Sequence, residues 1–116
     1  MVEIKMQVSD NLAQRLRPMS LWLPVVLELS LIGFKTAAVQ TASEIIGFLS
    51  TGPAPVEVAA YTVSEEAQER LRRLLALNEA SRLSQTEQNE LDELEQAEHI
   101  MILLKAQAQE HLTNSA

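Results

Sequence analysis

At 116 residues, the chain is long enough for one small domain, or for a small domain with an extension. It contains no cysteine, which excludes disulfide bonds and thiolate chemistry and agrees with a reducing cytosol. The formal net charge is −7, and residues 1–50, with four basic and four acidic side chains, contribute none of it. Because the acidic residues 51–116 repel nucleic acid, any DNA contact is expected in the N-terminal half.

The composition favours helices around an aliphatic core, since 47% of the residues are hydrophobic and only 3% are aromatic. No secretory signal is expected, because Glu3 and Lys5 interrupt the terminus where an apolar segment would lie. The apolar run at residues 21–34 includes Pro24 and Glu28, and it is too short and too polar for a bilayer, which needs about 20 residues. We therefore expect a cytoplasmic protein that makes no contact with a membrane.

The N-terminus opens with a regular alternation of apolar and polar residues. Val2, Ile4, Met6 and Val8 are apolar, and the residues between them are polar. Successive side chains of a strand point to opposite faces, so this pattern predicts a half-buried β-strand. No later segment supplies a partner strand, and the strand is therefore expected to pair with its copy in a homodimer.

Two helices are predicted directly after this strand. Ser9 is placed to cap a helix over residues 10–17, which the following proline ends. Ser20 is placed to cap a second helix over residues 21–31, with Gly33 near its end.

A strand followed by two helices within residues 1–35 resembles the ribbon-helix-helix DNA-binding superfamily, to which many bacterial repressors and toxin–antitoxin antitoxins belong. The resemblance implies a dimer whose paired strands form a ribbon that fits the major groove of DNA. From Leu21 onward the sequence is also similar to small bacterial proteins with no assigned activity, which implies no function.

On such a ribbon the polar residues of the strand would face the bases. Lys5 can donate to guanine, Gln7 can bond adenine, and Glu3 can accept from cytosine, although an ordinary solvated strand face would look the same. Arg15 and Arg17 could contact phosphates or merely complement the helix dipole. The expected DNA contacts are Glu3, Lys5, Gln7, Arg15, Arg17 and, at a helix N-terminus, Ser20.

A third helix is predicted over residues 37–50, where apolar residues fall at helical spacing. The proline- and glycine-containing stretch after it is the strongest breaker in the chain. We expect residues 1–50 to form the dimerisation and DNA-binding region, residues 51–63 a linker, and residues 64–116 an acidic helical hairpin. Pro55 could begin one short helical turn within the linker.

The hairpin has clear start signals. Ser64 precedes a helix predicted over residues 65–79, and Ser84 with Glu87 has the spacing of a capping box that begins a helix over residues 85–110. The short connection predicts antiparallel packing. The residues expected to face inward on the second helix are Leu91, Leu94, Ala97, Met101, Leu104 and Ala108.

An acidic ridge at residues 87–98 and an apolar run at residues 100–104 make this hairpin the expected partner-binding part. Apolar residues cover every side of the helix in that run, and the other helix of the hairpin can cover only one side. The N-terminal helices or another subunit must therefore cover the remaining apolar side chains. The expected partner is a basic protein such as a toxin. The expected contact residues are Glu90, Glu93, Met101 and Leu104.

Catalysis, metal binding and a cofactor are not expected. The chain has two histidines, and the pair Glu95 and His99, one helical turn apart, is too small a set for a metal site. Three scattered glycines cannot form a phosphate-binding loop. We therefore predict a mostly α fold with one N-terminal β-strand paired across a dimer, a third helix and a helical hairpin.

The function predicted from these features is a dimeric DNA-binding repressor or antitoxin-like protein, with the hairpin binding a protein partner. The alternative is a helical protein–protein interaction or assembly module with no DNA role.

Overall fold

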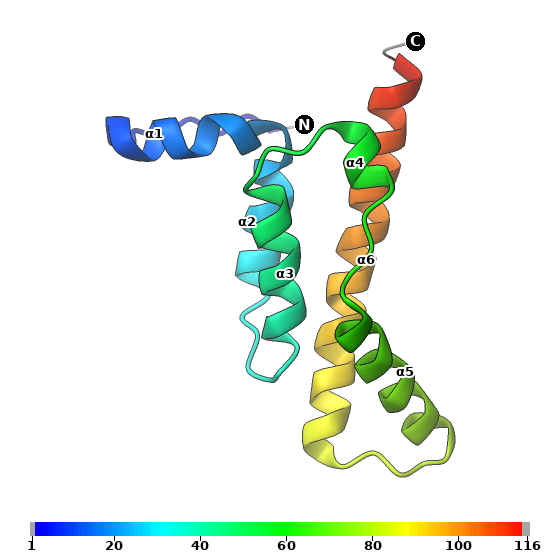
Figure 1. Ribbon diagram of the computed structural model, residues 1–116. Helices are drawn as coiled ribbons and strands as arrows, with labels where there is room; N and C mark the ends of the chain where they lie inside the picture. The colour runs from blue at the N-terminus through cyan, green and yellow to red at the C-terminus, as the bar shows by residue number, and fades with distance from the viewer. Residues whose placement is uncertain (1, 115–116) are drawn as a thin grey trace.

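The computed structural model of the chain describes residues 2–114, and over that range every regular element is a helix. Apart from α1, these elements form the body of the molecule, in which the long α6 is flanked by two groups of shorter helices (Figure 1). The elements are α1 (Asp10–Leu16), the 3-10 helix η1 (Arg17–Trp22), α2 (Leu23–Leu31), α3 (Val39–Leu49), α4 (Pro55–Ala59), α5 (Glu65–Glu79) and α6 (Gln85–Asn114).

The predicted N-terminal β-strand is wrong. Residues 2–9 are extended, but they pair with no other segment of the described chain, and the fold class is all-α rather than mostly α with a dimer ribbon. Val2 is 90% exposed and Ile4 is 78% exposed. The alternation describes one strand only, whereas a sheet also needs a second backbone to take its hydrogen bonds, and this chain supplies none.

The first predicted helix begins at Asp10 and the second ends at Leu31, as expected, but the passage between them differs from expectation. Ser9 does cap α1, because its Oγ accepts a hydrogen bond from the Leu12 amide at 3.1 Å. The α-helix α1 ends before Pro18 as predicted, but the chain continues directly into η1, with Pro18 in the first turn, where its missing N–H is tolerated. Ser20 therefore lies exposed inside η1 and caps nothing, and α2 begins after Trp22 instead.

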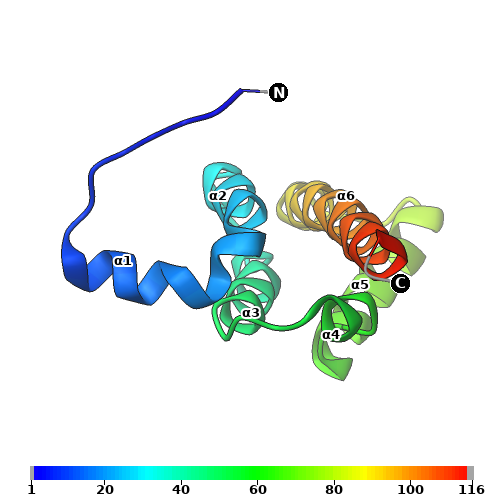
Figure 2. The same cartoon turned by 90° about the horizontal axis from the view of Figure 1, so that it is seen from above.

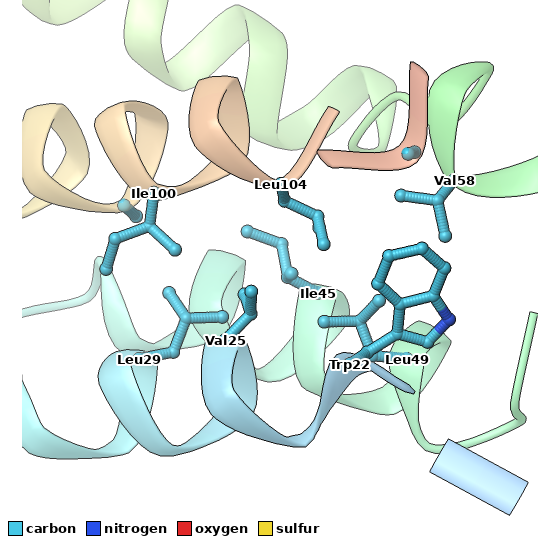
Figure 3. Packing of buried hydrophobic residues seen from close by; sticks show 10 residues of the cluster. Trp22, Val25, Leu29, Ile45, Leu49, Val58, Ile100 and Leu104 are labelled. Carbon is cyan, nitrogen blue, oxygen red and sulfur yellow. The ribbon is translucent and has the colours of Figure 1, made fainter. Parts of the chain in front are cut away.

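The main hydrophobic core packs η1, α2, α3 and α4 against the C-terminal half of α6 (Figure 3). Val58 of α4 is completely buried in this cluster, although it falls in the segment expected to be a linker. Side chains from both sides of residues 51–63 thus share one core. Its members are Trp22, Val25, Leu29, Ile45, Leu49, Val58, Ala97, Ile100, Leu104 and Ala108.

The α5–α6 hairpin confirms the start signals that were read in the sequence. Ser64 caps α5, and Ser84 and Glu87 form the expected capping box, with hydrogen bonds of 3.0 and 3.1 Å. The two helices run in opposite directions and pack through a second cluster, which contains Leu74, Leu91 and Leu94 together with Ala38. Of the residues expected to face inward on α6, only Met101 is not buried, and Ile100 is buried in its place.

Candidate interaction surface

The predicted DNA-contact residues all lie on the exposed N-terminal part of the chain. Glu3, Lys5 and Gln7 belong to the extended residues 2–9, which we call the arm, and their side chains are exposed. Arg15, Arg17 and Ser20, on α1 and η1, are exposed as well. Within residues 2–114 the arm does not form the β-strand on which these residues were expected to read bases.

Glu90 does not lie on a solvated ridge, because it is the buried charged residue of the α5–α6 hairpin, with 5% exposure. Its carboxylate accepts hydrogen bonds from Arg70 Nε at 2.8 Å and from Arg70 Nη2 at 2.9 Å. These hydrogen bonds, which Arg70 donates to the Glu90 carboxylate, raise the pKa of Arg70 above its usual value. Glu90 therefore joins α5 to α6.

Glu93 binds the connection between α2 and α3. Its carboxylate accepts hydrogen bonds from Thr36 Oγ1 at 2.6 Å and from the amides of Lys35 and Thr36 at 3.0 and 3.2 Å. Burial raises the pKa of Glu93, but these hydrogen bonds and the charge of Lys35 outweigh burial, so that the pKa is lowered overall. Glu93 thus anchors the turn that precedes α3.

The other two predicted partner contacts differ in accessibility. Leu104 is completely buried in the main core, whereas Met101 is half-buried at the surface of α6. Met101 lies in a groove of about 340 Å³ that the sequence did not suggest, because one of its walls comes from residues 61–63 in the expected linker.

The buried residues that line the groove, Ile45, Leu94 and Ala97, are apolar and are called its floor, and the less buried polar residues Thr41, Glu98 and Lys105 are called its rim. Its walls are α3, the segment 61–63, the start of α5, and α6 from Leu94 to Lys105. Tyr61 is held in place by stacking on Phe48, with ring centroids 4.2 Å apart, and burial together with nearby Glu44 raises its pKa. Gln68 is fixed by a 2.8 Å hydrogen bond from its Nε2 to the Val63 carbonyl. The site is therefore preformed.

A second feature that sequence reasoning missed is the outer face of α2. All residues of this helix except Glu28 and Ser30 are apolar, yet it buries only Val25 and Leu29. Leu27 and Leu31, one turn apart, remain exposed, and Leu31 is 83% exposed. Neighbouring exposed leucines form an apolar patch, so the outer face of α2 has the character of an interface. The regular spacing of these leucines was the signal available in the sequence.

The arm and α1 project from the body, as Figure 2 shows. None of the residues of α1 is buried. The Cα radius of gyration is 16.1 Å, against about 13 Å for a compact domain of this length. The accessible surface is 8191 Å², whereas a compact monomer of this mass exposes about 6,300 Å², so the excess is about 1,900 Å².

Clusters of metal-ligating side chains and membrane-spanning helices are two further kinds of feature that would bear on function in the part of the chain that the structure describes. Within residues 2–114 there is no cluster of three or more potential metal ligands, and no helix is both long and apolar enough to cross a membrane. Comparison of the chain with protein-family models, with curated proteins and with solved structures finds no match.

Proposed function

We propose that this protein is a self-associating helical assembly module that uses the arm and the outer face of α2 as its apolar contacts. The observation that carries the proposal is the surface excess of about 1,900 Å², because each partner of a standard interface buries about 800 Å². A single copy therefore exposes enough additional area for a stable interface.

The chemistry of the exposed part supports the same function. Val2, Ile4 and Met6 on the arm and Leu27 and Leu31 on α2 are all exposed aliphatic side chains. Burying such side chains is worth about 1.5–3 kcal/mol each, which association can recover. The net charge of residues 1–50 is zero, so this part of the chain can contact a second, acidic copy without electrostatic repulsion between like net charges.

Sedimentation velocity over a range of micromolar concentrations tests this function with matched pairs of variants. Met6→Asp and Leu31→Asp remove an apolar contact and add a charge, and each should lower the association constant at least tenfold. Gln7→Asp and Ser30→Asp, at exposed neighbouring positions, add the same charge and should have little effect. A wild-type chain that stays monomeric up to about 100 μM, a range in which standard interfaces are stable, would overturn the proposal.

A DNA-binding role, with or without a basic protein partner, remains a prediction of its own. Lys5, Gln7, Arg15 and Arg17 are exposed on the neutral part of the chain, where DNA could approach them. A gel shift of the upstream DNA with wild type and with the Lys5→Ala/Gln7→Ala double variant tests it. A salt-sensitive shift that the double variant abolishes would support the DNA role, and no shift with wild type would contradict it.

A further inference from the structure

We infer that the arm of one copy docks in the groove of a second copy, and that the exchange is reciprocal. This inference rests on the proposed self-association and names the surface that receives the arm. The arm contributes no residue to the groove of its own chain, which is lined by α3, residues 61–63, α5 and α6. It joins the end of α1 that lies away from the other helices instead (Figure 2).

The apolar part of the arm is short enough to fit along the groove. Val2, Ile4 and Met6 lie on one face of an extended segment and span about 13 Å, at about 3.3 Å per residue. Along α6, the groove side chains from Leu94 to Lys105 span about 17 Å, at about 1.5 Å per residue. Three successive apolar side chains of the arm can therefore follow the exposed wall of α6.

The polar side chains at the rim of the groove can form hydrogen bonds with the extended backbone of the arm, so the arm does not need to pair with another strand. Each peptide group of the arm brings an N–H and a C=O that need partners when they are covered. Thr41, Glu98 and Lys105 line the groove and together offer both donors and acceptors. The apolar floor then takes the side chains, and the polar rim takes the main chain.

The exposed area and the charge both favour a second copy as the occupant. The surface excess of about 1,900 Å² is about twice the share of one partner in a standard interface, as expected when each copy buries both an arm and a groove. Such an exchange has the two-fold symmetry of common homodimers. The arm carries Glu3 and Lys5, so it is neutral and can approach a chain of net charge −7.

Disulfide trapping tests the docking directly, because the chain has no cysteine of its own. A tagged Ile4→Cys chain is mixed with an Ile102→Cys chain, and the same mixture is made with Leu103→Cys as the control. Ile102 lines the groove and is 61% exposed, whereas its neighbour Leu103 does not line it and is 53% exposed. A disulfide forms only where the two Cα atoms come within about 7 Å.

We expect the mixed disulfide with Ile102→Cys to form at least tenfold faster than the one with Leu103→Cys. Equal rates, or a product dominated by Ile4→Cys joined to itself, would overturn docking in the groove. Both results would leave self-association standing if the wild type sediments as a dimer. The two proposals therefore fail separately.

Aspartate substitutions give a second test that needs no cross-link. Ile102→Asp should weaken self-association about as much as Met6→Asp, and Leu103→Asp should not. Because the arm and the groove form one contact, the Met6→Asp/Ile102→Asp double variant should associate about as weakly as either single variant. Fully additive losses would mean that the two residues act at different places and would overturn the inference. The circular dichroism of each variant verifies that the fold is kept.

Discussion

The indole Nε1 of Trp22 donates a 2.8 Å hydrogen bond to the carbonyl oxygen of Pro53, across 31 positions of the sequence. Both residues are buried, and the bond ties η1 to the segment that leads into α4. The rings of Trp22 and His111 of α6 also pack nearly perpendicular to each other, with centroids 6.2 Å apart. The one tryptophan therefore holds three parts of the chain together.

Trp22→Phe should destabilise the fold by about 1–3 kcal/mol, because the Pro53 carbonyl loses its partner while it stays covered. The smaller ring adds a packing loss in the same direction. Urea unfolding followed by far-UV circular dichroism measures the change. A variant within about 0.5 kcal/mol of wild type would mean that water replaces the indole N–H, which the buried position of Pro53 argues against.

Arg70 and Glu90 should show measurable coupling in a double-mutant cycle. The Glu90 side chain is 6% exposed and the Arg70 side chain is 41% exposed, so the pair is more shielded than a surface ion pair but less than an interior one. We expect a coupling free energy of about 1–2 kcal/mol from Glu90→Ala, Arg70→Ala and the double variant. Glu95→Ala, at an exposed position of the same helix, should change stability by less than about 0.5 kcal/mol. A coupling free energy near zero would mean that apolar contacts alone hold α5 against α6.

Glu93 should make stability depend on pH on the acid side. Its pKa in the folded chain is below the ordinary value of 4.5, so its contribution is complete above that value and is lost as the pH falls through the folded pKa. The free energy of unfolding should therefore decrease as the pH is lowered from about 5 to 3. Glu93→Gln should flatten this decrease, and the exposed neighbour Glu95→Gln should keep it. Equal slopes for Glu93→Gln and wild type would contradict the assignment.

Three glycines should respond differently to alanine. Gly52 has a φ of +71°, and a Cβ there would collide with the backbone carbonyl of Pro18, so Gly52→Ala should be the most damaging. Gly33 has a φ of +70° but open space around it, and Gly33→Ala should cost about 1–2 kcal/mol from the backbone alone. Gly47 lies inside α3 with open space, and Gly47→Ala should stabilise by about 0.5–1 kcal/mol. Thermal unfolding of the three variants gives the order, and any other order would contradict it.

Two adjacent leucines of α6 should differ strongly on truncation. Leu104 is completely buried in the main core, so Leu104→Ala should cost about 2–5 kcal/mol. Leu103 is 53% exposed, and Leu103→Ala should cost less than about 1 kcal/mol. Chemical unfolding at low protein concentration measures both without a contribution from association. Similar losses would contradict the assignment of Leu104 to the core and of Leu103 to the surface of the folded chain.

Most of the helices could be predicted because their signals are local. Ser9, Ser64 and Ser84 each bond an amide three residues ahead, so that the residue type and its spacing are enough to place a helix start. The same locality explains the error at Ser20, since the sequence does not show that a 3-10 helix containing Pro18 and Ser20 follows α1 directly.

The sequence by itself determined where most of the helices lie, because helix caps and helical spacing depend on residues only a few positions apart. It also determined which half of the chain carries the net negative charge, because charge follows directly from residue type. Only the tertiary structure decided what each surface residue contacts. The alternation at residues 2–8 became an unpaired arm, since a strand depends on a partner backbone elsewhere. Glu90 and Glu93 became internal anchors because Arg70 and Thr36, both distant in sequence, meet them when α5 and the α2–α3 connection pack on α6.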